Sequence, residues 1–307
     1  MKRCFYILLL LPFWASSQDI HFSQWHKNPL FQSPALAGSF DGSYRITAHQ
    51  REQWASVSVP FQSTTVGFDM PYKSWGFGAQ FLRDQSGSSR LSLTQLSLLL
   101  SRSLENWRFG LQMGLVQQNI DFSDLVFIDN TEDIFSLSKS YIDLGLGLYK
   151  DIYFTSSDIN IGYSIFHLNT PNRSFFASED RLKVKHSLVS EWNYPLNSQW
   201  TLVPSMQWQS QQKQREWTIG SLIRLDISDL YYKNIQLEGG GYYRFGDAVS
   251  VLLGLHLGQS QLAFSYDWNV SDLVPASNAL GAWELSFHHI INTSMPRPIY
   301  KTCPAFL

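Results

Sequence analysis

Hydrophobic and polar residues alternate with a period of two over most of the chain, and no long stretch shows a helical period. In the clearest segment, large apolar side chains occupy every second position from Trp107 to Leu115, with Gly or polar residues between them. The same alternation runs over residues 142–149 and 261–268. Because successive side chains of a strand point to opposite faces, the pattern predicts strands with one apolar and one polar face.

About fourteen segments of this kind follow one another, a number within the range of outer-membrane barrels. They cover residues 42–51, 56–69, 75–84, 90–102, 106–118, 140–152, 158–168, 182–194, 199–209, 214–225, 231–245, 248–257, 260–269 and 281–293. A soluble all-β sandwich is the alternative, but one shared interior does not easily accommodate so many one-sided strands. The pattern therefore favours an all-β fold, a transmembrane antiparallel β-barrel of an outer membrane.

The connections between these segments alternate in length. Residues 119–139, 169–181 and 270–280 form long connections, whereas residues 70–74, 103–105, 195–198 and 258–259 form short ones. Outer-membrane barrels place short turns in the periplasm and long loops outside the cell. Residues 226–230 are the exception, because they are longer than a tight turn and lie on the short side. An even strand number puts both ends of the barrel in the periplasm.

The N-terminus predicts export. Lys2 and Arg3 precede a short apolar run, and Ala15-Ser16-Ser17 is suited to signal peptidase. The run is shorter than the roughly 20 apolar residues that span a bilayer. We expect a cleaved Sec-type signal peptide over residues 1–17, and Cys303 as the one cysteine of the mature chain.

Composition agrees with a barrel exposed to two solvents. Only 16% of residues are charged, and 15% are aromatic, against roughly 25% charged residues in ordinary soluble domains. The pattern predicts that charged residues concentrate in loops and at strand ends, and that Trp near strand ends forms interface girdles. Without Lys2 and Arg3 the mature chain has a net charge of 21 − 25 = −4, which argues against nucleic acid as a partner.

Catalytic and cofactor motifs are absent from the sequence. There is no G-x-S-x-G, H-E-x-x-H, Walker loop or C-x-x-C, so we expect no enzyme, no cofactor and no metal site. A Ser/His pair across the lumen, with His256 or His288, stays an alternative that no motif selects. The acidic cluster in residues 119–139 could hold Ca²⁺, but its spacing is not an EF-hand pattern and a solvated loop is the default.

The segment after the signal carries distinctive motifs. It contains Asp19-Ile-His-Phe-Ser-Gln24, Ser33-Pro-Ala-Leu-Ala-Gly38, Gly42-Ser-Tyr-Arg45 and Arg51-Glu-Gln-Trp54. It resembles the opening of the PorP/SprF family of type IX secretion system membrane proteins of Bacteroidota. Further similar segments follow in the family's order: Tyr141–Tyr149, Ile161–Leu168, Gly240–Arg244, Ser265–Asp267, Gly281–Ser286 and Pro296–Phe306.

Two positions depart from the family pattern. Ser33 replaces the usual Asn before Pro34, and Trp283 replaces the usual His before Glu284. A binding role of that His would be lost here, and the resemblance supplies no catalytic residue.

The resemblance implies a fourteen-stranded barrel that helps to export or anchor large surface adhesins, including those of gliding motility. The cargo would carry a type B C-terminal secretion domain, and periplasmic ring components are further possible partners besides outer-membrane lipid. A passive porin or small-molecule transporter is the alternative function, since the same strands would serve it.

We divide the mature chain into a lead-in or plug over residues 18–40, a barrel over 41–294 and a periplasmic tail over 295–307. The lead-in is polar, aromatic and broken by prolines, unlike a membrane strand. It could plug the barrel, present a periplasmic docking strand, or be a mere connection tucked under the barrel. Candidate partner-binding residues are His21, Phe22, Gln24, Trp25, Arg45, Arg51 and Trp54.

Overall fold

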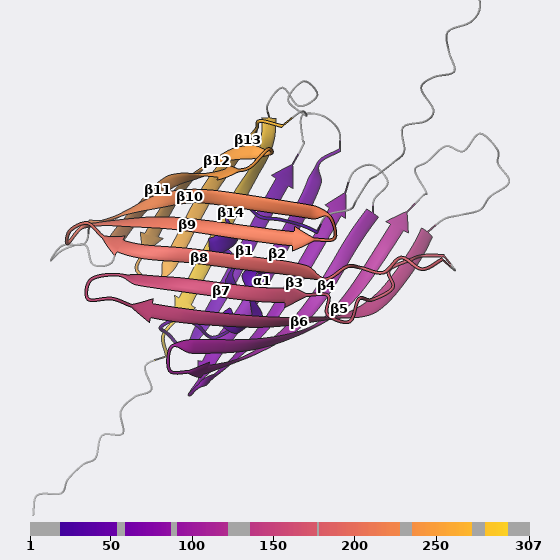
Figure 1. Cartoon of the computed structure of the whole chain (residues 1–307), viewed down its shortest axis with the longest axis horizontal. Helices are drawn as coiled ribbons and strands as arrows, with labels where there is room; N and C mark the ends of the chain where they lie inside the picture. The colour runs from indigo at the N-terminus through magenta and orange to yellow at the C-terminus, as the bar shows by residue number, and fades with distance from the viewer. Residues whose placement is uncertain are drawn as a thin grey trace, which may run out of the picture.

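The chain forms a closed barrel of antiparallel strands (Figure 1). The structure is a computed structural model, and it describes residues 19–53, 59–86, 91–121, 136–176, 178–227, 235–271 and 280–293. Each strand pairs with its neighbours in the sequence, and the last strand pairs with the first. The strands are β1 (Tyr44–Gln53), β2 (Phe61–Tyr72), β3 (Trp75–Ser86), β4 (Leu91–Leu104), β5 (Trp107–Asp121), β6 (Ser136–Tyr153), β7 (Asp158–Phe166), β8 (Lys185–Pro195), β9 (Trp200–Gln211), β10 (Gln214–Asp226), β11 (Ile235–Arg244), β12 (Ala248–Leu257), β13 (Ser260–Asn269) and β14 (Leu280–Ile291).

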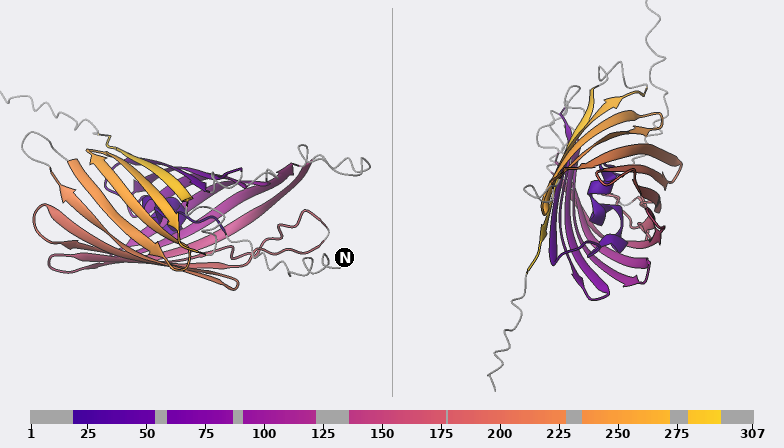
Figure 2. Two further views of the ribbon diagram at one scale, coloured as in Figure 1. Left: turned by 90° about the horizontal axis from the view of Figure 1, so that it is seen from above. Right: turned by 90° about the vertical axis from the view of Figure 1, so that its left-hand side faces the viewer.

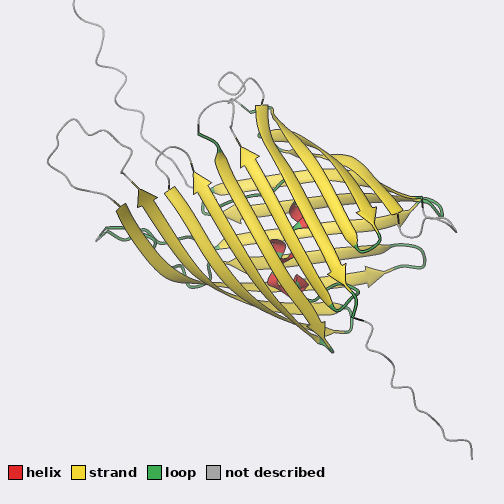
Figure 3. Ribbon diagram, turned by 180° about the vertical axis from the view of Figure 1, so that it is seen from behind, coloured by secondary structure: helices red, strands yellow, loops and turns green. Residues whose placement is uncertain are grey.

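Each of the fourteen predicted segments overlaps one strand, so the predicted fold is confirmed (Figure 3). The largest differences lie at strand ends. The segment predicted over 56–69 is β2, which starts at Phe61 and runs on through Pro71. Pro71 is tolerated because its register partner, Gly76, lies next to the hairpin turn, where few ladder bonds remain to be lost.

The period-two pattern separates two faces of the wall. Along β5, the apolar residues from Trp107 to Leu115 are exposed on the outside, whereas Gly110, Gln112 and Gly114 are buried. Outer-membrane barrels present apolar side chains to lipid in this way. Five of the Trp residues near strand ends are also exposed on the outside, namely Trp75, Trp107, Trp200, Trp217 and Trp268, whereas Trp283 is half-buried.

The two ends of the barrel differ, as the connection lengths predicted. At one end, two-residue turns contain Lys73 and Glu105 with φ of 56° and 53°. At the other end lie the connections over 122–135, 167–184 and 270–279. Two connections at this long-loop end are nevertheless short, at 212–213 and 245–247. The long-loop end faces the outside of the cell in such barrels.

One expectation about charge was wrong. Charged residues do not concentrate only in loops and at strand ends, because many lie buried on the inner face of the strands. They are Arg45, Arg51, Asp69, Asp143, Asp151, Lys185, Glu238, Arg244, Asp267 and Glu284. They pair with each other, with other charged side chains of the wall or with residues that fill the lumen, as buried charges must.

No helix among the described residues is long and apolar enough to cross a membrane. The predicted signal peptide, the C-terminal tail with Cys303, and most of the acidic loop lie outside the described residues.

Candidate functional site

Residues 19–40 lie inside the barrel (Figure 2, right view). They form three short helical turns, η1 (Trp25–Lys27), α1 (Pro29–Gln32) and η2 (Pro34–Leu36). Pro29 and Pro34 each begin a turn, where the missing N–H of proline is not needed. The prolines shape a compact segment rather than a strand, and we call residues 19–40 the plug segment.

The plug segment runs through the lumen from one end to the other. The backbone N–H of Asp19 donates to Gln211 Oε1 at 3.3 Å, at the long-loop end of β9. The N–H of Gly38 donates to Asp69 Oδ2 at 2.7 Å, close to the turn between β2 and β3. The segment therefore starts near the extracellular side and reaches β1 from the periplasmic side.

Glu284 on β14 is the main anchor of the plug segment. Its carboxylate accepts the backbone N–H groups of Ser23 at 2.7 Å and Gln24 at 2.8 Å. The amide of Gln24 donates to Ser265 Oγ and to the carbonyl of Glu284, and accepts from Ser286. Glu284 and Gln24 are both fully buried. Buried polar groups with this many partners specify one arrangement of the chain.

Two arginines complete this anchor. Arg51 Nη1 contacts the carboxylate of Glu284 and lies 3.1 Å from Asp267 Oδ2 and from Ser23 Oγ. Arg244 Nη2 donates to the same Asp267 oxygen at 3.0 Å. Two cations and two carboxylates therefore balance inside the wall, which is the condition under which buried charges are tolerated. We call Arg51, Arg244, Asp267 and Glu284 the anchor cluster.

A second ion pair fixes the end of the plug segment. Arg45 donates from Nε and Nη2 to the two oxygens of Asp69, at 3.0 and 2.7 Å, and Nη2 also donates to the carbonyl of Leu36 at 3.1 Å. The Arg45 guanidinium also lies over the ring of Phe40, 4.6 Å from its centre. A bidentate pair of this kind sets orientation as well as charge.

Lys27 ties the plug segment to the opposite strands. Its Nζ lies 2.5 Å from Glu238 Oε1 on β11, and Arg224 Nε lies 2.9 Å from the other oxygen. Burial lowers the pKa of Lys27, and the charge of Glu238 opposes that shift. The plug segment is thus held at several points around the circumference.

Two glycines make room for the plug segment. A Cβ on Gly110 would lie 2.1 Å from the backbone N of Ala35, and one on Gly147 would lie 2.4 Å from Ser33 Oγ. Neither distance is possible for real atoms, so strands β5 and β6 need glycine where η2 contacts them. Ser33 Oγ also accepts a hydrogen bond from Ser164 on β7 at 2.8 Å.

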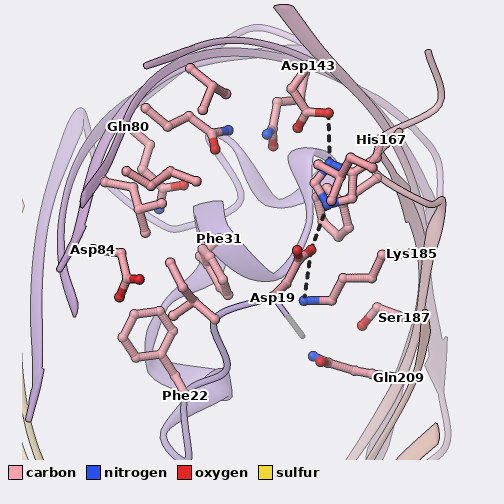
Figure 4. A pocket seen from close by; sticks show the side chains of 18 of the residues that line it. Asp19, Phe22, Phe31, Gln80, Asp84, Asp143, His167, Lys185, Ser187 and Gln209 are labelled. Carbon is pink, nitrogen blue, oxygen red and sulfur yellow. Dashed lines mark hydrogen bonds and ion pairs between the residues drawn. The ribbon is translucent and has the colours of Figure 1, made fainter. Parts of the chain in front are cut away.

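The start of the plug segment is held by a histidine between two carboxylates (Figure 4). His167 Nε2 lies 2.6 Å from Asp19 Oδ2, and Nδ1 lies 2.8 Å from Asp143 Oδ1. Burial lowers the pKa of His167, but Asp19 and Asp143 outweigh this effect and raise it to about 9. Burial raises the pKa of Asp19, but the charge of His167 and that of Lys185 outweigh burial and hold it well below its usual value. We call this triad the histidine clasp.

A cavity of about 190 Å³ opens beside the clasp, between the plug segment and strands β3 to β9 (Figure 4). Phe22 and Phe31 line it from the plug side. Gln80, Gln112 and Gln209 line it from the wall. The lining therefore combines aromatic rings with amides that can donate and accept hydrogen bonds.

Six of the seven residues proposed for partner binding lie in the lumen. Gln24 and Arg51 meet at Glu284, Phe22 packs edge-on against Phe31, and Arg45 binds Asp69. Trp25 is buried against Tyr242, and His21 Nε2 lies 3.5 Å from Arg51 Nη2. Trp54 lies outside the described residues.

The carboxylates that receive these residues were not predicted from the sequence. Asp69, Glu238, Asp267 and Glu284 are each the one acidic residue on the polar face of a strand, and Asp143 shares its face of β6 with Asp151. An isolated acidic residue at a lumen-facing position was the available signal, since a buried carboxylate requires a partner. No cluster of three or more His, Cys, Asp or Glu that could hold a metal is found within the described ranges.

A family model described as "Type IX secretion system membrane protein PorP/SprF" matches residues 15–289. The chain belongs to the PorP/SprF family. As a PorP/SprF protein with a closed barrel, it is an outer-membrane protein of the type IX secretion system. Comparison with functionally characterised proteins finds no match.

Two solved structures with a similar fold are described as toluene transporters. The toluene transporter TbuX of Ralstonia pickettii is 9% identical with a TM-score of 0.57, and the match covers 87% of this chain and 94% of TbuX. The toluene transporter TodX of P. putida is 9% identical with a TM-score of 0.54, covering 87% of this chain and 95% of TodX. At this identity the likeness shows the fold alone.

Proposed function

We propose that this PorP/SprF protein is a non-enzymatic outer-membrane component that assists export or surface attachment of large adhesins. The cargo would carry a type B C-terminal secretion domain, and gliding motility would be one process that such adhesins serve. Periplasmic ring components of the type IX machinery are proposed as further partners.

The observation that carries this proposal is the family match over residues 15–289 in a barrel whose lumen is occupied. The plug segment contacts β14 through Gln24, β2 through Asn28, β7 through Ser33 and β11 through Lys27. A lumen filled in this way suits a scaffold better than an open passage. The long-loop end supplies the extracellular surface on which a cargo domain would dock.

We propose that the candidate residues in the lumen contact a partner when that partner displaces the plug segment. His21, Phe22, Gln24 and Trp25 belong to that segment, and Arg45 and Arg51 hold it. A partner that enters from either end would meet these residues on displacing the segment, so they would set how firmly the barrel is closed.

Deleting the gene tests the proposal. We expect one specific large protein to disappear from the cell surface and to return when the wild-type gene is supplied. If the set of proteins on the cell surface did not change on deletion, the proposal would be contradicted. An accumulation of the missing protein in the periplasm would assign the defect to export, and its release into the medium would assign it to attachment.

A passive small-molecule transporter is the second candidate, and the cavity of about 190 Å³ beside the plug segment favours it. The two functions separate in a planar bilayer. Steady single-channel conductance of the purified wild-type protein would favour transport, whereas a closed barrel that conducts only when the plug segment is destabilised would favour the scaffold.

A further inference from the structure

Strand β6 is paired unequally on its two sides. With β5 it pairs from the register partners Asp121 and Ser136 onward, along almost its whole length. With β7 it pairs only from Leu146 onward, where Ile165 is its register partner. The part of β6 nearest the long-loop end therefore has a strand on one side and none of the described strands on the other (Figure 1, right-hand side of the barrel).

The residues that follow β7 show how this edge binds an extended chain. The N–H of Leu168 donates to the carbonyl of Leu144 at 3.0 Å. The side-chain amide of Asn169 accepts from the N–H of Leu144 at 3.2 Å and donates to the carbonyl of Ile142 at 2.6 Å. Asn169 thus presents an amide to β6 where the next peptide group of a paired strand would lie.

Beyond Asn169 no described strand pairs with the edge. Because main-chain groups of a strand point alternately to its two sides, Ser140 and Ser138 face the same way as Ile142 and Leu144. Among the described residues none hydrogen-bonds the N–H or C=O of Ser138 or Ser140 on this side. An unpaired row of this kind is a template for another extended chain, and most proteins cover or blunt it.

This part of the edge stands outside the lipid. The outward-facing residues of β6 change from Ile142 and Leu144, which are exposed and apolar, to Ser136, Ser138 and Ser140. Serine is unsuited to an apolar band that faces acyl chains, so the membrane boundary lies near Ile142. The change occurs where the pairing with β7 has already ended, and a partner can therefore reach the edge from water.

The inner face of the edge carries one unpaired charge. Lys139 lies between Ser138 and Ser140, on the same face as Tyr141, which lines the lumen cavity. No carboxylate in the described part of the chain pairs with Lys139. A strand added to the edge would therefore be favoured by an acidic side chain facing Lys139.

We propose that the β6 edge from Ser136 to Tyr141 binds one extended strand of the secreted partner protein by β-strand addition. The bound strand hydrogen-bonds through its backbone to Ser138 and Ser140 and places a carboxylate opposite Lys139. This assignment rests on the proposed function for the identity of the partner, but the edge itself is defined by the pairing of β6.

Amide hydrogen exchange tests whether the edge is occupied, whatever the partner is. The peptide over residues 136–141 is followed in native outer-membrane vesicles and in the purified full-length protein. We expect exchange at Ser138 and Ser140 to be at least about tenfold slower in the vesicles, since each new hydrogen bond must open before exchange. Equal exchange in the two samples would overturn the proposal.

Binding of an isolated type B C-terminal secretion domain, taken as the probe, tests the geometry. Ser138→Pro and Ser140→Pro remove the N–H groups on the free side and leave the bonds to β5 intact. We expect binding to weaken by about ten- to a hundredfold. Ser138→Thr and Ser140→Thr keep these N–H groups and should bind as wild type, and heat-modifiable gel mobility confirms that each barrel is folded.

A charge variant avoids any change to the backbone. Lys139→Glu should weaken binding of the probe several-fold, and Lys139→Arg should not. Equal binding of wild type and the proline variants would overturn the proposal while leaving the proposed function intact. Failure of the probe to bind wild type would count against the proposed cargo, and exchange at Ser138 and Ser140 would still decide whether the edge is occupied.

Discussion

The two sides of the lumen hold the plug segment in different ways. On the side of β13, β14 and β1, the anchor cluster holds Ser23 and Gln24 through buried hydrogen bonds to Glu284, whose charge is paired with Arg51. On the side of β6 to β9, the histidine clasp holds Asp19 beside a cavity. The anchor cluster combines many buried charged contacts, whereas the start of the segment is held by one charged cluster next to open space.

This difference indicates where the plug segment can move. Local opening begins where few buried contacts must be broken, and the free energy of opening rises with their number. Release at the clasp would allow the start of the segment to move into the cavity while Gln24 stays bound to Glu284. Displacing the whole segment would require the anchor cluster to open as well, leaving buried charges without partners.

The largest effect is expected from Glu284→Ala. It removes the acceptor for Arg51 and for the N–H groups of Ser23 and Gln24, all of them buried. Breaking one partner of a buried ion pair costs about 3–5 kcal/mol. We expect a lower urea midpoint in detergent micelles and the appearance of conductance in a planar bilayer.

Glu179→Ala is the matched control for Glu284→Ala. Glu179 also pairs with an arginine, Arg181, at 3.3 Å, but both side chains are largely exposed. An exposed pair contributes about 0–1 kcal/mol. Equal loss of stability in the two variants would contradict the assignment of Glu284 as the main anchor.

A smaller effect is expected from Gly110→Val, which inserts atoms where η2 meets the wall. Overpacking of this kind costs typically about 1–3 kcal/mol. The plug segment must shift away from β5, so we expect faster proteolysis within residues 19–40. Gly239→Ala is the comparison, since its Cβ would meet Leu253 Cδ2 at an ordinary 3.6 Å; similar proteolysis in both variants would count against close packing at Gly110.

The sequence predicted the wall far better than its contents. Residues 107–115 alternate strictly because one face meets lipid and the other the lumen, and this local rule recurs in each strand. The positions at which strands end were predicted less well. Asn169, for example, continues the edge of β6 with a side chain, which no alternation reveals.

The contacts of the plug segment could not be predicted in the same way, because they join distant parts of the chain. Gln24 and Glu284 are separated by 260 residues along the chain, and nothing near Gln24 indicates where its partner lies. The polar face of β5 was read as small and hydrogen-bonding, but Gly110 is small because Ala35 packs against it. Charges inside the wall were missed because charged residues were expected in loops and at strand ends, whereas a plug supplies counter-charges to residues on the inner face of the strands.

A further prediction concerns pH and the histidine clasp. The pKa of His167 is raised to about 9, above its ordinary value near 6.5. The stabilisation from the clasp is therefore fully present below pH 6.5 and is lost as pH rises through 9. The lowered pKa of Asp19 acts in the opposite range, because its contribution is lost only in strong acid.

We expect the start of the plug segment to loosen between pH 7 and 10, seen as faster amide exchange at Ile20 to Phe22. His167→Gln should remove this pH dependence and cost about 1–2 kcal/mol, less than Glu284→Ala, because the clasp lies beside the cavity. His289→Gln is the control, since that side chain hydrogen-bonds only to Ser260 among the described residues. A pH dependence that persists in His167→Gln would place the titrating group elsewhere.

The smallest effect is expected from Asp180→Asn, in the connection between β7 and β8. Arg173 Nε donates to Asp180 Oδ2 at 3.0 Å within the connection that follows the clasp, and the Asp180 carboxylate is exposed. Asp180→Asn should change stability by about 0.5 kcal/mol or less. If it nevertheless accelerated exchange at Ile20, the loop and not His167 alone would hold the start of the plug segment. The weak side of the lumen would then extend to the extracellular surface, where a docking partner could release it without entering the barrel.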